Sequence, residues 1–134
     1  MTVDFVVEGR AIPKARPRVT KSGHSYTPKA TVKYEEKVRI AWKVQSGFKY
    51  KGEIALCAEI RFHMAIPKSE KKKRTVGEPY LKQRDIDNCD KAVLDALNGY
   101  AYEDDKYIWK IESSKVYAER DYTEVKIYPL ITDS

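Results

Sequence analysis

The stretch of sequence that decides the fold is EIALCAEIRFHMAI, residues 53–66. Hydrophobic side chains alternate along it with polar ones, and a period of two residues is that of a β-strand with one buried face. The residues expected on the buried face are Ile54, Leu56, Ala58, Ile60, Phe62, Met64 and Ile66, with Glu59, Arg61 and His63 opposite. This segment therefore predicts a long, half-buried strand.

The clearest helical pattern follows in DNCDKAVLDALN, residues 87–98. Its apolar residues recur at helical spacing and form one stripe. Asp87 is expected to cap the start of this helix, and Asn98 with Gly99 to close its end. The residues of the stripe are Cys89, Ala92, Val93, Ala96 and Leu97.

The remaining segments complete a small domain. Residues 31–46 predict a second helix, in which Tyr34, Val38, Ala41 and Gln45 mark the inner side and Ile40, Trp42 and Val44 widen it. The order strand-helix-strand-helix-strand-strand indicates one α/β or α+β domain over residues 1–134, with a mixed sheet flanked by two helices. The other expected segments are a strand at 3–7, a loop at 9–31, a mobile basic loop at 67–84, and strands at 107–118 and 123–131.

Composition excludes several classes of protein. The chain has 134 residues and no apolar run near the roughly 20 that a membrane span needs, so neither a membrane protein nor a membrane partner is expected. The N-terminus lacks the basic and apolar regions of a secretory signal. Two cysteines, Cys57 and Cys89, provide neither a disulfide framework nor a four-thiolate zinc site. A cytoplasmic location is therefore the expectation.

Charge is distributed unevenly along the chain. The net charge is +6, but residues 1–84 hold 20 basic and 8 acidic side chains, whereas residues 85–134 hold 6 basic and 12 acidic ones. A basic part of this kind indicates a polyanionic partner. Acidic residues that face a polyanion oppose binding unless they hold a metal ion beside a phosphate.

The acidic residues gather around the helix at 87–98. Asp85 and Asp87 flank its start, Lys91 and Asp95 follow at intervals of one turn, and residues 103–105 (Glu-Asp-Asp) precede a strand. Carboxylates brought into one cleft repel, and a hard divalent cation such as Mg²⁺ relieves that repulsion. The alternative is that Asp87, Lys91 and Asp95 form ordinary surface ion pairs and Asp87 is only a cap.

Two basic segments are expected to lie on loops and to hold DNA backbones beside the acidic site. No acidic residue occurs between positions 9 and 34. The alternative is a solvated run of charge, above all for residues 71–74. The first segment contains Arg10, Lys14, Arg16, Arg18, Lys21, Lys29 and Lys33, and the second Lys68, Lys71, Lys72, Lys73, Arg74, Lys82 and Arg84.

The acidic and basic residues together resemble a known signature. The run Arg84-Asp85-Ile86-Asp87-Asn88, then Lys91, Asp95-Ala96-Leu97 and Asp104-Asp105, is similar to that of the RusA-type Holliday junction resolvases. Residues 13–18 (PKARPR) and 26–28 (YTP) resemble phage and prophage members.

The resemblance implies a homodimeric endonuclease that makes paired symmetric cuts in four-way junction DNA during recombination and repair. It implies a requirement for Mg²⁺ or Mn²⁺ and no organic cofactor. Asp85, Asp87 and Asp105 match the metal-binding aspartates, Lys91 matches the catalytic lysine, and Arg84 a residue that contacts DNA. The resemblance also favours DNA contacts by Lys14, Arg16 and Arg18. Any share of Glu103 or Asp104 in the metal site, and the role of residues 68–82, stay open.

Two other functions remain open from the residues alone. One is a non-catalytic nucleic-acid-binding protein whose acids only cap helices. The other is a nuclease without preference for junctions. Two matched cuts need two sites, and since one chain carries one set of aspartates, a two-fold homodimer is the economical arrangement for a resolvase.

Overall fold

The computed structural model describes residues 2–130, which form the small α+β domain that the pattern predicts. The predicted end of the last strand at residue 131 lies outside this range. No helix within it is long and apolar enough to cross a membrane. The elements are β1 (Val3–Glu8), β2 (Arg18–Val19), β3 (Ser25–Tyr26), α1 (Lys29–Gln45), β4 (Leu56–Ala65), α2 (Ile86–Leu97), β5 (Ile108–Ala118) and β6 (Tyr122–Pro129), with short 3₁₀ turns η1 (Lys68–Glu70) and η2 (Asp105–Tyr107).

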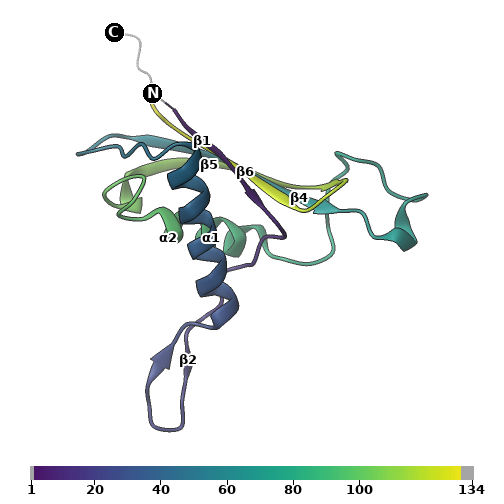
Figure 1. Cartoon of the computed structure of the whole chain (residues 1–134), viewed down its shortest axis with the longest axis horizontal. Helices are drawn as coiled ribbons and strands as arrows, with labels where there is room; N and C mark the ends of the chain where they lie inside the picture. The colour runs from purple at the N-terminus through teal and green to yellow at the C-terminus, as the bar shows by residue number, and fades with distance from the viewer. Residues whose placement is uncertain (1, 131–134) are drawn as a thin grey trace.

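Four strands form a mixed sheet in the order β1-β6-β4-β5. Strand β4 pairs antiparallel with β6 and parallel with β5, and α2 lies in the connection that this parallel pair requires. Both helices lie on one side of the sheet (Figure 1). This topology carries α2 back over the sheet and brings its polar residues to the start of β5.

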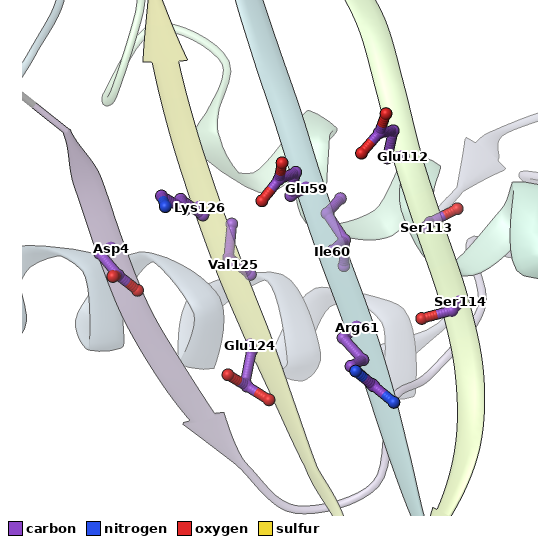
Figure 2. Close-up of a pocket in the computed structure, with 10 residues that line it drawn as sticks. All are labelled: Asp4, Glu59, Ile60, Arg61, Glu112, Ser113, Ser114, Glu124, Val125 and Lys126. Carbon is purple, nitrogen blue, oxygen red and sulfur yellow. The ribbon is translucent and has the colours of Figure 1, made fainter. Parts of the chain in front are cut away.

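The predicted alternation in β4 is confirmed. Ala58, Ile60, Phe62 and Met64 are buried in the core, while Arg61 is exposed on the opposite face of the sheet. That opposite face is polar, and Figure 2 shows its charged side chains in front of the strands with the helices behind. They include Asp4, Glu59, Arg61, Glu112, Glu124 and Lys126.

The inner face of α1 is narrower than predicted. Tyr34, Val38 and Trp42 are buried, whereas Ile40 is 63% and Val44 79% exposed. Each exposed residue follows a buried one by two positions, which rotates its side chain about 200° around the helix axis. The expectation that Ile40 and Val44 widen the apolar side was therefore wrong.

Part of the loop predicted at 9–31 is a short β-hairpin. Arg18 pairs with Tyr26 and Val19 with Ser25, and the turn between them includes Gly23 at φ +87°. The hairpin projects beyond one end of α1, away from the sheet (Figure 1). Strands of two residues are too short to produce a recognisable alternation, so the sequence predicts only a loop here.

The second basic loop, at 67–84, is tied to the sheet. The backbone N–H of Gly77 donates to Tyr117 O, Tyr117 N–H donates to Glu78 O, and Tyr80 N–H donates to Lys115 O. Glu70 also forms an ion pair with Lys82 across the loop. Residues 77–80 therefore lie paired along the last residues of β5, within the segment that was predicted to be a mobile loop.

Candidate active site

Helix α2 begins at Ile86, one residue before the predicted start, and its N-cap lies two residues before the predicted cap Asp87. Asp85 occupies the N-cap position without a capping hydrogen bond from its side chain, and Asp87 lies in the first turn. The amide of Asn88 is 3.5 Å from the Asp85 carboxylate. At the other end Asn98 is the C-cap and Gly99 has φ +82°, as the sequence predicted. The Asp85 carboxylate is therefore not used as a cap.

The backbone turns sharply just before α2. Arg84 has φ +72°, a left-handed conformation that costs a non-glycine residue about 1–2 kcal/mol. Its carbonyl accepts a 2.9 Å hydrogen bond from Lys115 Nζ, which reaches across from β5. This bond holds the turn that sets the direction of Asp85 and of the first turn of α2.

A cleft of about 280 Å³ opens between α2 and the start of β5. It brings together three of the predicted catalytic residues, Asp87 and Lys91 from α2 and Asp105 from η2. Asp85 is not among the residues that line it. The lining consists of Asp87, Asp90, Lys91, Leu94, Asp95, Asp105 and Ile111.

The three acids at 103–105 have three different partners. Asp104 Oδ1 accepts a 2.9 Å hydrogen bond from the Lys106 N–H and caps η2. Glu103 accepts a 3.3 Å bond from the N–H of Gly52. Asp105 lines the cleft, where burial, a hydrogen bond that its protonated form donates to Asp104, and the charges of Asp104 and Asp95 raise its pKa. Asp105 is therefore the acid of this run that is available at the cleft.

Asp90 belongs to the cleft but was missed by the sequence analysis. It is 8% exposed, and Ser113 Oγ donates a 2.7 Å hydrogen bond to its Oδ2. Its Oδ1 is buried and has no hydrogen-bond partner within residues 2–130. Burial raises the pKa of Asp90 to about 6, and the nearby charge of Asp87 adds to the rise. The sequence did contain a sign of this role, because Asp90 is an acid next to the apolar stripe of the helix and follows Asp87 by about one turn.

Lys14, which was predicted to contact DNA, forms ion pairs within the protein. Its Nζ lies 2.6 Å from Glu35 Oε1 and 3.4 Å from Asp95 Oδ2, and its backbone N–H donates to Asn88 O. Burial alone would lower the pKa of Lys14, but the hydrogen bond with Glu35 and the charges of both acids raise it. Lys14 thus ties the basic loop to both helices.

Other predicted DNA-binding residues remain free. Arg16 lies just before the hairpin and Arg18 lies in it, and both are exposed. No acid of the described chain lies within 4 Å of either side chain. The same holds for Lys71, Lys72 and Lys73. Arg74 differs because its guanidinium pairs with Glu78 at 3.1 Å and lies 5.5 Å from the ring centre of Tyr117.

The donor set of the cleft suits a hard cation. Aspartate oxygens are the ligands that Mg²⁺ prefers, and the unpaired buried oxygen of Asp90 and the raised pKa of Asp105 both show a surplus of acceptors and negative charge. Within residues 2–130, however, no three acids converge closely enough to form a metal-ligand group. Asp87 and Asp105 line the cleft and Asp85 lies at the N-cap of α2, and their role as metal ligands stays a prediction.

An aspartate-lined cleft in a chain that also exposes free basic side chains is the combination expected of a protein that handles the phosphates of nucleic acids. A family model described as "Endodeoxyribonuclease RusA" matches residues 8–128. The chain therefore belongs to the RusA endodeoxyribonuclease family, whose members are nucleases of the Holliday junction resolvase type and generally use a divalent metal. This confirms the family resemblance seen in residues 84–105.

A curated relative has also been found. The chain is 29% identical over 136 residues to the uncharacterized protein YqaN of Bacillus subtilis (strain 168), and the match covers 93% of this chain and 94% of the relative. The similarity thus extends over nearly the whole of both proteins.

Proposed function

We propose that this protein is an endonuclease that cuts four-way DNA junctions in pairs of symmetric positions, with Mg²⁺ or Mn²⁺ as its metal. The observation that carries the proposal is the cleft in which Asp87 and Lys91 of α2 meet Asp105 of η2 in a RusA-family chain. The proposed working form is a homodimer, because two cuts need two such clefts.

The metal would be held by Asp87 and Asp105, joined by Asp85 from the start of α2. When bound, a divalent cation activates water and stabilises the leaving oxygen of a phosphodiester. The chain supplies the carboxylates and their fixed positions. The bond from Ser113 to Asp90 and the cap made by Asp104 hold the two walls of the cleft in place.

Lys91 is the proposed electrostatic partner of the scissile phosphate. It lines the cleft beside Asp87 and Asp95 and forms no ion pair within the described part of the chain. An ammonium group at the mouth of an acidic cleft stabilises negative charge that develops on a phosphate in the transition state. We therefore assign Lys91 a catalytic role.

The free basic side chains would hold the arms of the junction. Arg16 and Arg18 extend the reach of the protein through the hairpin (Figure 1), and Lys71, Lys72 and Lys73 do so from the second basic loop. Phosphate contacts fix the position of DNA without reading its sequence. Recognition of the shape of the junction therefore comes before any preference for sequence.

The decisive experiment is nicking of a synthetic mobile four-way junction with Mg²⁺ and with chelator. Wild type would be compared with Asp87→Asn, and with Asp4→Asn on the open face of the sheet as a matched control. We expect paired, Mg²⁺-dependent cuts at the junction from wild type and Asp4→Asn, and junction binding without cleavage from Asp87→Asn.

Two results would replace the proposal. Salt-dependent binding without strand scission by wild type would favour a non-catalytic binding protein. Equal cutting of a linear duplex of the same sequence would favour a nuclease without preference for junctions.

A further inference from the structure

One stretch of the sheet edge has no covering. On β1, the side-chain amide of Gln45 donates to Val6 O at 2.7 Å and accepts from Val6 N–H at 2.8 Å. At the end of β5, residues 77–80 pair with Lys115 and Tyr117. The part of β5 before this, residues 108–114, is the outermost segment of its sheet and has no strand beside it in the described chain.

The backbone of this open stretch is directed outward. The carbonyl of Lys115 and both backbone polar groups of Tyr117 bond to residues 77–80 at the outer edge. Because alternate residues of a strand direct these groups to the same edge, those of Ile111 and Ser113 also point outward. Unpaired groups in a row are a template for another strand.

The side chains of the open stretch are unusual for an unprotected edge. Trp109 is 55% and Ile111 46% exposed. The register with β4 shifts between Ile108 and Lys110, and Lys110 and Glu112 carry charge, so the stretch has part of the protection of a natural edge, but large apolar side chains at unpaired backbone still favour association. The edge thus has both the backbone groups and the apolar surface of an interface.

The sequence of this stretch complements itself. Residues 108–114 are centred on Ile111, so a two-fold axis there would place Lys110 of one copy opposite Glu112 of the other, and the reverse. Ile111 would meet its own counterpart. Lys110 and Glu112 already lie within 3.1 Å of each other in one chain, on the open face of the sheet. Opposite charges on directly facing residues stabilise an antiparallel pair.

We propose that residues 108–114 form a homodimer interface, in which β5 pairs antiparallel with β5 of a second copy around Ile111. The two sheets become continuous, and the two acidic clefts, each lined by Ile111, lie on the same face close to the axis. The inference deepens the proposed function, which requires two copies. The test measures the mass of the particle and not DNA cleavage, so the dimer interface and the nuclease activity can each fail without the other.

The test is sedimentation velocity over a concentration series, at low salt, with charge reversals. Lys110→Glu and Glu112→Lys each place like charges opposite each other twice in the dimer. We expect wild type to be dimeric and each single variant to show a dissociation constant about tenfold higher or more. The double variant, Lys110→Glu with Glu112→Lys, restores opposite charges and the wild-type constant.

Two controls keep the result specific. Val44→Lys changes an exposed apolar residue on α1, away from this edge, and should leave the dimer unchanged. Thermal unfolding of every variant shows whether the chain is folded. A monomeric wild type, single reversals that dimerise as well as wild type, or a double variant that fails to recover would each overturn the interface.

Discussion

Ser113 Oγ donates a 2.7 Å hydrogen bond to Asp90 Oδ2, and this bond joins β5 to α2 at the acidic cleft. It links the two elements whose residues line the proposed active site. The bond satisfies one carboxylate oxygen and leaves the other, Oδ1, buried without a partner in the described chain. Asp90 is therefore ionised at neutral pH only at a cost to folding.

The first prediction concerns the pH dependence of stability. Burial raises the pKa of Asp90 to about 6 in the folded protein, above the usual value of 3.8. The folded state binds the Asp90 proton more tightly than the unfolded state does, and this preference stabilises the fold. The contribution is fully present below about pH 4 and is lost as the pH rises through 6, where the folded protein releases that proton. We expect Asp90→Asn to be more stable than wild type by about 3 kcal/mol at pH 7.5, because each unit of pKa shift is worth about 1.4 kcal/mol, with the difference vanishing near pH 4.

The measurement is urea unfolding with chelator present at several pH values. Asp4→Asn, on the exposed face of β1, is the matched control and should follow the wild-type curve. A difference between Asp90→Asn and wild type that does not vary with pH would contradict the role of the buried carboxylate.

The second prediction separates Lys14 from the free arginines. Lys14→Met leaves Glu35 and Asp95 without their cation, and since these groups are partly buried we expect a loss of about 1 kcal/mol of stability. Arg16 has no acidic partner among residues 2–130, so Arg16→Ala should leave stability unchanged but reduce the slope of log K against log salt for junction DNA by about 0.9.

Urea unfolding and binding titrations at several salt concentrations would measure both effects. Full stability in Lys14→Met, together with a reduced salt slope, would restore Lys14 as a direct DNA contact.

The third prediction distinguishes two adjacent acids. Asp105→Asn removes a proposed metal ligand, so Mg²⁺-dependent cleavage should fall about a hundredfold or more. The affinity for Mg²⁺, measured by calorimetry, should also fall. Asp104→Asn should keep both, because asparagine also accepts the N-cap hydrogen bond from Lys106. Equal losses in the two variants would show that both acids serve the metal.

The sequence predicted the sheet-forming segments and the apolar stripe of α2 because these follow simple periods over long stretches. It did not predict that Lys14 is paired, since its partners Glu35 and Asp95 are distant in the chain and meet only when α1 packs on α2. Spacing along α2 placed Asp87 and Lys91 on one polar side, but the depth of Asp90 depends on Ser113 and on the packing of β5. The pairing of Lys14 and the burial of Asp90 could therefore be seen only in the tertiary structure.

The last prediction concerns the turn that starts α2. Arg84 has φ +72°, a conformation that glycine adopts without strain and other residues do not. Arg84→Gly and Arg84→Ala both remove the charge, so both should weaken junction binding to a similar extent. Only alanine retains the strained Cβ, and the glycine variant should be the more stable of the two by about 1 kcal/mol. Because Lys115 bonds to the backbone carbonyl at this position, neither change removes that hydrogen bond.

Thermal unfolding would measure the difference in stability between the two variants, and binding titrations would measure their affinity for junction DNA. An alanine variant as stable as the glycine variant would refute a strained turn.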